Sequence, residues 1–285
     1  MKAPGMKVMA HELASTANAS AQDALSPYKE ALREHFPTRE ALLQEAKQQT
    51  KRQRVLKKVG SGMAMSLALA LSWVIDPVWH SENMRTKVGQ QASFTLTDGS
   101  HVALNTNSAL VVEQHLYSRR LYLKQGEALF TAEHGWRPFT VYANQTQIRD
   151  IGTIFNVRNT DQGAVVTVVE GSVEVRTPQA RRILTRDVSV TTQAGGITES
   201  RCSSANIAWQ QGRLMFDGHA LASVVDELQR YRHGRIQIAD RLAAQYRLSG
   251  EFDISGIDTL LDTLPDIMPV SITKKDDGTV LISHR

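Results

Sequence analysis

The sequence predicts a mixed fold: a short helical head, a single transmembrane helix, an antiparallel all-β domain and a small α/β domain. Three observations predict it. Residues 59–75 form an apolar stretch without charge, short alternating runs separated by turns follow Arg85, and apolar residues adopt helical spacing after Ala208. The predicted boundaries are 1–58 for the head, 59–79 for the span, 84–195 for the β-rich domain and 205–285 for the α/β module.

Charge is distributed unevenly along the chain. Of its 33 Lys and Arg residues, 11 lie in residues 1–58, together with 6 of the 29 Asp and Glu residues. The positive excess therefore precedes the apolar stretch, and the rest of the chain is nearly neutral, which argues against an extended nucleic-acid surface. The single cysteine, Cys202, excludes an intrachain disulfide.

The stretch from Val59 to Ile75 is predicted to span a membrane. Seventeen helical residues rise ~26 Å, which is just enough to cross. Five Lys and Arg residues within 51–58 precede the stretch, and Trp73 and Trp79 fall at interfacial depth. The positive-inside rule predicts a single-pass inner-membrane protein with a cytoplasmic N-terminus and a periplasmic C-terminus. A buried core helix and a signal peptide are the alternatives, although more than fifty preceding residues fit a signal peptide poorly.

Beyond the span, alternating apolar residues predict strands. In residues 93–105 they flank Asp98-Gly99, a pair typical of a tight hairpin turn. Eight to eleven such strands are expected, in a sandwich, a jelly roll or a solenoid-like stack. Gly126, Gly152 and Gly171 are interpreted as turn or bulge positions.

The last part of the chain mixes strand and helix patterns. Leu221, Val224, Val225 and Leu228 have the spacing of a helix that packs on its own sheet. Strand and helix patterns then alternate to the C-terminus, which predicts a small α/β module. Residues 194–204 are interpreted as the linker before it.

The head is predicted to be partly unstructured and partly helical. Ser26-Pro27 and Pro37-Thr38 are helix-start signals, and two short helices are too small to build a core alone. We therefore expect the head to fold on a partner. The candidate partner-binding residues are Leu32, Phe36, Leu42 and Leu43.

No motif in the sequence predicts catalysis. Nucleophile-elbow, phosphate-loop and dinucleotide motifs are absent, as are the close His or Cys pairs of a zinc site. We expect no enzyme activity, no cofactor and no metal. The basic run KRQRVLKK borders the apolar stretch, so we assign it to the membrane surface and expect no direct DNA binding.

Over residues 84–285 the sequence resembles the FecR family of sigma-factor regulators. Arg120 and a series of short motifs in the family's order carry the resemblance: 97–100 (TDGS), 104–108 (LNTNS), 123–130 (LKQGEALF), 137–141 (RPFTV), 152–157 (GTIFNV) and 169–173 (VEGSV). Residues 209–216 (WQQGRLMF), 230–231 (RY) and 248–252 (LSGEF) are similar to the family's C-terminal region, which is related to the short domain of secretins and TonB-dependent receptors.

The resemblance implies a relay across two membranes. It implies that the head holds an extracytoplasmic-function sigma factor, and that the periplasmic part contacts the signalling domain of an outer-membrane TonB-dependent receptor. Membrane proteases would then release the head, regulating transcription for the uptake of iron or another nutrient. The head differs from the family pattern because it is shorter and has no Trp before Trp73. The alternative is a structural single-pass envelope protein with periplasmic interaction domains.

Overall fold

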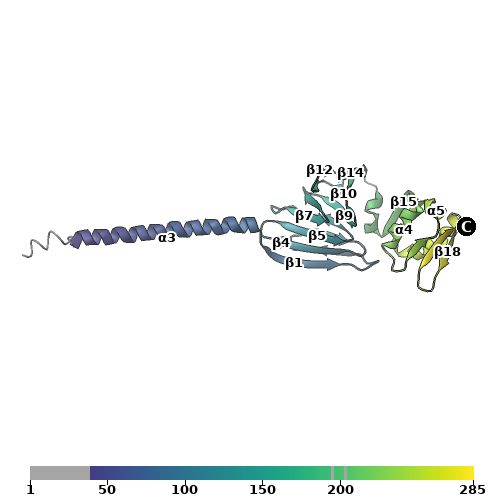
Figure 1. The fold of residues 1–285 in the computed structure, drawn as a ribbon, viewed down its shortest axis with the longest axis horizontal. Helices are drawn as coiled ribbons and strands as arrows, with labels where there is room; N and C mark the ends of the chain where they lie inside the picture. The colour runs from purple at the N-terminus through teal and green to yellow at the C-terminus, as the bar shows by residue number, and fades with distance from the viewer. Residues whose placement is uncertain (1–38, 194–195, 202–203) are drawn as a thin grey trace, which may run out of the picture. The chain divides into compact units, whose positions relative to one another are not determined.

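The protein is described by a computed structural model that covers residues 39–193, 196–201 and 204–285 (Figure 1). It divides into two compact units between Val74 and Ile75. The first described element is a long helix, and the rest is mostly β-sheet with few helices, as predicted for the β-rich part.

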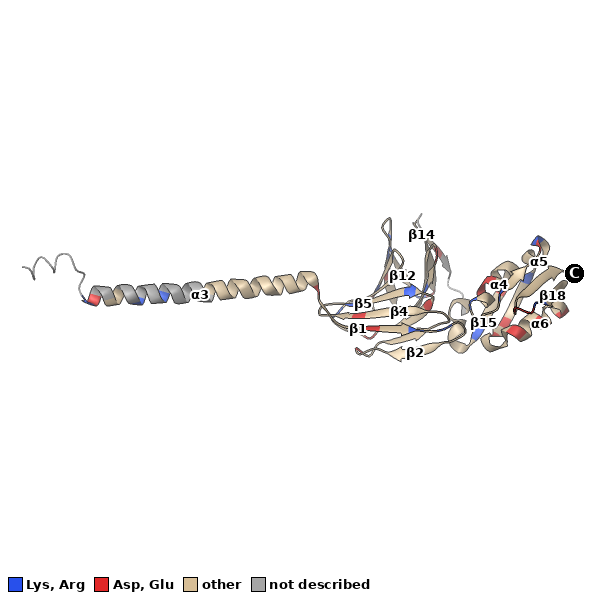
Figure 2. Ribbon diagram, turned by 60° about the horizontal axis from the view of Figure 1, so that its bottom comes forward, with Lys and Arg blue, Asp and Glu red and all other residues tan. Residues whose placement is uncertain are grey.

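Helix α3 (Arg39–Ile75) runs for 37 residues without interruption. No proline occurs within it, so the predicted second helix of the head and the apolar stretch form one continuous helix. The hydroxyl groups of Ser66 and Ser72 donate to the carbonyls of Gly62 and Leu69, at 3.0 and 2.9 Å. From Val59 to Ile75, α3 carries no charged residue (Figure 2).

Within the described part of the chain, no helix has the length and apolarity that a membrane crossing requires. Val78 and Trp79, which lie inside the predicted span of residues 59–79, do not continue the helix but begin strand β1 (Val78–Arg85). Asp76, with a φ of 45°, and Pro77 separate the helix from that strand.

Asp76 is tied to the turn between β4 (Ala109–His115) and β5 (Arg119–Gln125). Its carboxylate accepts hydrogen bonds from the amide of Tyr117 at 2.8 Å and from the hydroxyl of Ser118, and it pairs with Arg120 at 3.0 Å. The carbonyl of Asp76 lies 2.6 Å from Nδ1 of His115. The residue that follows α3 is therefore fixed to the sheet before the first strand begins.

Fourteen strands of the described residues form two sheets of seven. The first sheet has the order β1 (Val78–Arg85), β4 (Ala109–His115), β5 (Arg119–Gln125), β7 (Phe139–Ala143), β8 (Thr146–Asp150), β11 (Ser172–Arg176) and β12 (Arg181–Thr185). The second has the order β14 (Gly196–Arg201), β13 (Val188–Gln193), β10 (Gly163–Glu170), β9 (Ile154–Thr160), β6 (Glu127–Thr131), β3 (His101–Leu104) and β2 (Ala92–Thr95).

The two sheets share one hydrophobic core, so the domain is a sandwich. Phe139 of the first sheet lies 6.2 and 6.5 Å, centroid to centroid, from Phe130 and Phe155 of the second. All three rings are fully buried. Of the three predicted alternatives, the sandwich, the jelly roll and the solenoid-like stack, the sandwich is the one observed, with more strands than the expected eight to eleven. One of them, β14, occupies part of the predicted linker.

One strand pair departs from the predicted antiparallel pattern, since β5 and β7 are parallel. The reason is the strand between them. After β5 the chain turns at Gly126 and enters the other sheet as β6, so its return as β7 runs in the same direction as β5.

The turn at Gly126 requires glycine. Its φ is 82°, and a Cβ atom there would lie 2.2 Å from Oγ of Ser108. Gly152, between β8 and β9, and Gly171, between β10 and β11, also mark places where the chain changes sheets. The three glycines are therefore turn residues, as interpreted, but between sheets instead of within hairpins.

The C-terminal module has its own core. Its elements are η1 (Ser204–Asn206), η2 (Ala208–Gln211), β15 (Arg213–Ala220), α4 (Leu221–Gln229), β16 (Ile236–Ile238), α5 (Arg241–Gln245), β17 (Arg247–Asp253), η3 (Ile254–Gly256), α6 (Ile257–Ile267), β18 (Val270–Lys274) and β19 (Val280–His284). Strand β15 pairs with β17, and β19 lies between β16 and β18. The four apolar residues predicted to share a helix face are all buried in α4.

Candidate functional site at the junction of the sandwich and the C-terminal module

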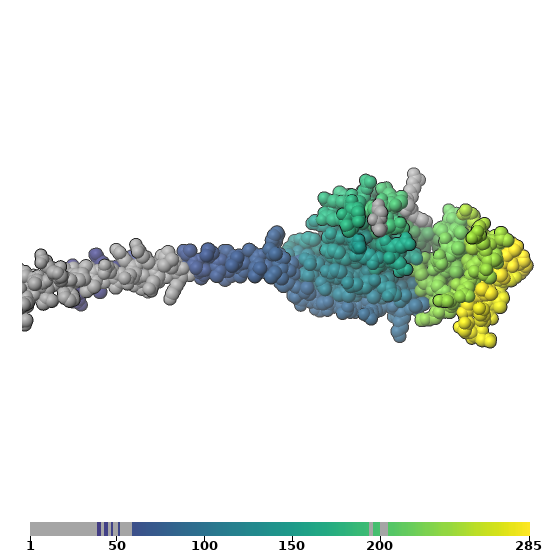
Figure 3. All heavy atoms as spheres, in the orientation of Figure 1, coloured from purple at the N-terminus to yellow at the C-terminus, as the bar shows by residue number. Residues whose placement is uncertain are grey.

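The sandwich and the C-terminal module belong to the same compact unit, and their atoms adjoin (Figure 3). Hydrogen bonds and ion pairs cross the junction. The side-chain amide of Gln91 donates to the carbonyl of Trp209 at 3.0 Å, and the hydroxyl of Thr106 donates to the carbonyl of Arg230 at 2.9 Å. Arg158 of the sandwich pairs with the carboxylate of Glu227 in the module at 2.7 Å. The module is thus held by side chains and by backbone.

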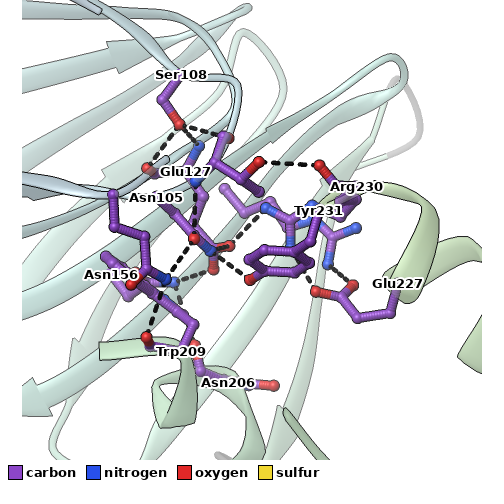
Figure 4. A network of polar contacts seen from close by, with 12 residues as sticks. Asn105, Ser108, Glu127, Asn156, Asn206, Trp209, Glu227, Arg230 and Tyr231 are labelled. Carbon is purple, nitrogen blue, oxygen red and sulfur yellow. Dashed lines mark hydrogen bonds and ion pairs between the residues drawn. The ribbon is translucent and has the colours of Figure 1, made fainter. Parts of the chain in front are cut away.

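Glu127 lies at the centre of this junction (Figure 4). It begins β6, and only 4% of its surface is exposed. Its carboxylate accepts hydrogen bonds from the side-chain amides of Asn105 at 2.9 Å and Asn156 at 2.8 Å, and from Nη2 of Arg230 at 2.6 Å. Asn105 follows β3 and Asn156 lies in β9. Because β6 runs between these two strands, the sheet itself sets the positions of both amides.

The module contributes the end of α4. Arg230 pairs with Glu127 and, through Nη1, with Glu227 at 2.5 Å, while Glu227 also pairs with Arg158 of β9 at 2.7 Å. Positive and negative groups therefore alternate from β9 to α4 and back to β6. The hydroxyl of Tyr231 accepts a hydrogen bond from the Asn105 amide at 2.7 Å.

The charges of this network fix one another. Burial raises the pKa of Glu227, but the guanidinium groups of Arg230 and Arg158 more than offset this, so the pKa lies below its usual range. Burial lowers the pKa of Arg230, and the carboxylates of Glu127 and Glu227 reverse that change and raise it. Burial also raises the pKa of Tyr231. Glu227 and Arg230 thus remain charged at neutral pH, with Tyr231 as a neutral hydrogen-bonding group.

A cavity of about 370 Å³ lies beside the network and has walls from both parts of the unit. Two buried polar atoms of its lining residues, Oδ1 of Asn156 and Nε1 of Trp209, have no hydrogen-bond partner. Gln114 supplies the third such atom among the described residues, at another place in the sandwich. Unpaired buried polar atoms cost about 1–3 kcal/mol each, so this junction is less completely satisfied than the rest of the unit.

We call this polar network the clamp. It consists of Asn105, Glu127, Asn156, Arg158, Glu227, Arg230 and Tyr231. It holds ion pairs and amides, and its charged groups neutralise one another in pairs. In the part of the chain that the structure describes, no three His, Cys, Asp or Glu residues are grouped closely enough to bind a metal ion. The arrangement can hold two folded parts together, and it can separate only if buried charges are exposed.

The sandwich side of the clamp lies in a segment with known relatives. Residues 82–174, from β1 into β11, match the family model FecR protein. They are a FecR domain. The FecR domain contributes Asn105, Glu127, Asn156 and Arg158 to the junction, and α4 beyond it contributes the partners. No curated protein matches this chain.

Two solved structures resemble the chain over a longer range. Both are crystal structures of a "putative anti-sigma factor" from Parabacteroides distasonis ATCC 8503, at 2.50 and 1.65 Å resolution. The first is 22% identical, covers 72% of this chain and 100% of its own, and has a TM-score of 0.63. The second is 23% identical, covers 72% and 99%, and has a TM-score of 0.62. The fold is therefore shared beyond the FecR domain, and the FecR resemblance of the sequence is confirmed.

Leu43 is the one predicted partner-binding residue whose side chain the structure describes. Leu32 and Phe36 are outside the described residues, as is the side chain of Leu42. Leu43 lies in α3 and is 51% exposed. It is not among the residues of the junction, so the clamp is a second candidate site.

Five clamp residues lie in motifs that carried the family resemblance, namely Asn105, Glu127, Asn156, Arg230 and Tyr231. No role was predicted for any of them. Arg158 and Glu227 were missed entirely. One signal was present, because Glu127 and Asn156 interrupt buried strand positions with polar side chains. Such positions need a partner, and the partner lies about a hundred residues away along the chain.

Proposed function

We propose that this FecR-domain protein regulates an extracytoplasmic-function sigma factor from the inner membrane. The observation that carries the proposal is the FecR domain at residues 82–174, within a fold shared with a protein described as an anti-sigma factor. In this proposal residues 1–58 lie in the cytoplasm and bind the sigma factor. The sandwich and the C-terminal module lie in the periplasm.

Membrane anchoring is supported by the surface of α3. From Val59 to Ile75 its large apolar side chains are exposed around the whole circumference, between 56% and 75%. A helix that is apolar on every side is stable when lipid or protein surrounds it. The Lys and Arg residues before Val59 favour a cytoplasmic N-terminus.

The periplasmic partner in this proposal is the signalling domain of an outer-membrane TonB-dependent receptor, in a system for uptake of iron or another nutrient. Free strand edges support a protein partner, since β18 pairs only with β19 among the described strands and β12 only with β11. An exposed strand edge can accept a further strand from another protein. Receptor binding would expose the chain to membrane proteases, which free the head with its sigma factor.

The decisive experiment is co-purification. The tagged full chain, solubilised from its native membrane, is expected to retain one sigma factor, and deletion of residues 1–50 should release it and change transcription from that sigma factor's promoters. Substituting Leu32, Phe36, Leu42 and Leu43 together by Ser should do the same. Exchange of Leu242 for Ser is the control, because this exposed leucine lies in the C-terminal module.

A topology reporter tests the membrane part separately. Alkaline phosphatase fused after Trp79 should be active, and the same fusion at residue 50 inactive. Unchanged transcription after deletion of residues 1–50, with the reporter still active after Trp79, would favour a structural envelope protein instead. An inactive phosphatase after Trp79 would exclude the relay across the membrane.

A further inference from the structure

One end of the sandwich presents large apolar side chains to solvent. We call it the proximal end, and it is the end at which residues 76–78 join the first sheet. Trp79 is 59% exposed, Leu116 45%, Trp136 75% and Ile151 53%. These side chains come from the start of β1, the β4–β5 turn, the β6–β7 loop and the β8–β9 turn.

Backbone contacts bring these loops together. The amide of Leu116 donates to the carbonyl of Pro77 at 3.1 Å, and the amide of Arg119 donates to the carbonyl of Pro138 at 2.8 Å. Arg137, the residue after Trp136, donates from Nη1 to the carbonyl of His115 at 3.2 Å.

The strand register adds the β8–β9 turn. Thr140 near the start of β7 pairs with Arg149 near the end of β8, so Ile151 emerges beside the start of β7. The four apolar side chains, from positions up to 72 residues apart, therefore share one end of the sandwich.

The core does not require these residues. The sandwich fills its interior with other side chains, three phenylalanines among them. Loops at the end of a sandwich are normally polar, and an exposed tryptophan contributes nothing to a fold that is already packed. The guanidinium of Arg137 lies 5.9 Å from the ring centre of Trp136, which gives that ring a polar neighbour. Tryptophan beside arginine is typical of the boundary between water and lipid.

The occupant follows from the connection to α3. Ile75 ends the charge-free part of the helix, and Val78, which begins β1, comes three residues later. Three residues reach at most about 10 Å. The headgroup layer on each side of the hydrocarbon core is about 5–7 Å thick. A domain tethered this closely to a membrane helix meets the headgroup layer with whichever surface bears the tether.

We propose that the proximal end, through Trp79, Leu116, Trp136 and Ile151, inserts into the headgroup layer of the bilayer in which α3 is anchored. This proposal rests on the membrane anchoring proposed above. The FecR domain then has a fixed orientation on the lipid surface. Its strands point away from the membrane, and the C-terminal module lies at the far ends of those strands.

The test uses the full chain in phosphatidylethanolamine and phosphatidylglycerol vesicles, with and without bromine on the upper part of the acyl chains. Bromine quenches nearby tryptophan. Comparing the parent with Trp136→Phe isolates the emission of Trp136, and Trp73→Phe isolates that of Trp73. Trp136 is exposed, so its exchange leaves the fold intact. The buried Trp209 is the unquenched reference.

Brominated lipid should quench Trp136 and Trp73, and leave Trp209 bright. Exchange of Leu116 and Ile151 for Ser should reduce quenching of Trp136 and leave that of Trp73 unchanged, whereas Ile183→Ser, a change at an exposed residue of β12, should alter neither. Quenching of Trp73 without quenching of Trp136 would overturn the insertion of the proximal end and leave the membrane anchoring of α3 intact. If neither tryptophan is quenched, the anchoring of α3 is itself overturned. Protection of Trp136 from aqueous acrylamide without quenching by lipid would show a protein on this surface, and would also overturn the proposal.

Discussion

Glu127 is a charged residue in a strand whose next three positions, Ala128, Leu129 and Phe130, are buried. A carboxylate is stable there because two amides and one guanidinium surround it. The two amides belong to the FecR domain, but the positive charge comes from Arg230 at the end of α4. The sandwich alone would therefore bury an uncompensated negative charge.

Exchange of Glu127 for Gln should lower the free energy of unfolding of residues 75–285 by about 3 kcal/mol, because it removes the charge that Arg230 faces. Urea titration at neutral pH measures this. Glu170→Gln is the matched control, since Glu170 is exposed at the end of β10, and its change should stay within about 0.5 kcal/mol. Equal losses in the two variants would show that the clamp adds nothing to stability.

Gly126 and Gly212 allow strain and crowding to be separated. Both have positive φ, of 82° and 72°, but a Cβ atom at Gly126 would overlap Ser108, whereas at Gly212 nothing lies within 4 Å. Gly212→Ala should cost about 1–2 kcal/mol from backbone strain alone. Gly126→Ala should cost about 1–3 kcal/mol more. The difference in urea midpoints measures the crowding, and similar midpoints would contradict it.

At the scale of elements, the β2–β3 hairpin is pinned to β5. The carboxylate of Asp98 in the hairpin turn pairs with the buried Arg119 at 2.6 Å and accepts from the amide of Ser100 at 3.1 Å. Burial raises the pKa of Asp98, but the bonds to Arg119 and Ser100 more than offset this and hold the pKa below the ordinary value of 3.8. The hairpin is thus attached by an ion pair to a strand of the other sheet.

This attachment predicts a pH dependence. A carboxyl whose pKa is depressed by folding stabilises the protein above its unfolded pKa, and the stabilisation is lost as pH falls through the folded value. Urea titrations from about pH 5 to about pH 3 should show a steeper loss of stability for the parent than for Asp98→Asn. Asp161→Asn, an exposed change in the β9–β10 turn, should keep the parent's slope. Identical slopes for all three proteins would contradict the role of Asp98.

Local sequence features predicted the elements better than their assembly. The Asp98-Gly99 hairpin joins β2 and β3, and the apolar spacing of α4 matches its buried face, because both depend on neighbours along the chain. The change of sheet at Gly126 was not predictable, since alternation with period two is the same in either sheet. The five-residue helix α5 is shorter than a detectable period, and its beginning rests on a cap by Asp240.

The clamp was not predictable for a related reason. Five of its residues sit in short motifs, and the motifs are ordinary when considered one at a time. Arg158 and Glu227 meet only after the module has packed against β9. The partner-binding residues chosen in the head rest on apolar type alone, and their role stays a prediction.

At the scale of the whole molecule, the clamp should make the sandwich and the C-terminal module unfold together. Residues 75–285 are expected to show one calorimetric transition, with equal calorimetric and van't Hoff enthalpies. Arg230→Gln removes the group shared by Glu127 and Glu227, so the two cores should then melt separately. Arg213→Gln breaks only an exposed pair with Glu251 and should keep the single transition. A single transition in Arg230→Gln would exclude this coupling.

The knot of bonds around Asp76 has a mechanical consequence. A pull on the chain at residue 76 first loads the bonds to Tyr117 and Arg120, and only then the ladder between β1 and β4. When the opposing force acts on the C-terminal module, the tension runs along β1. The hydrogen bonds between β1 and β4 then share the load and do not break one after another. The fold therefore resists tension that is applied through α3, the helix that precedes it in the chain. A cut between residues 75 and 78 would release that tension without disturbing either core.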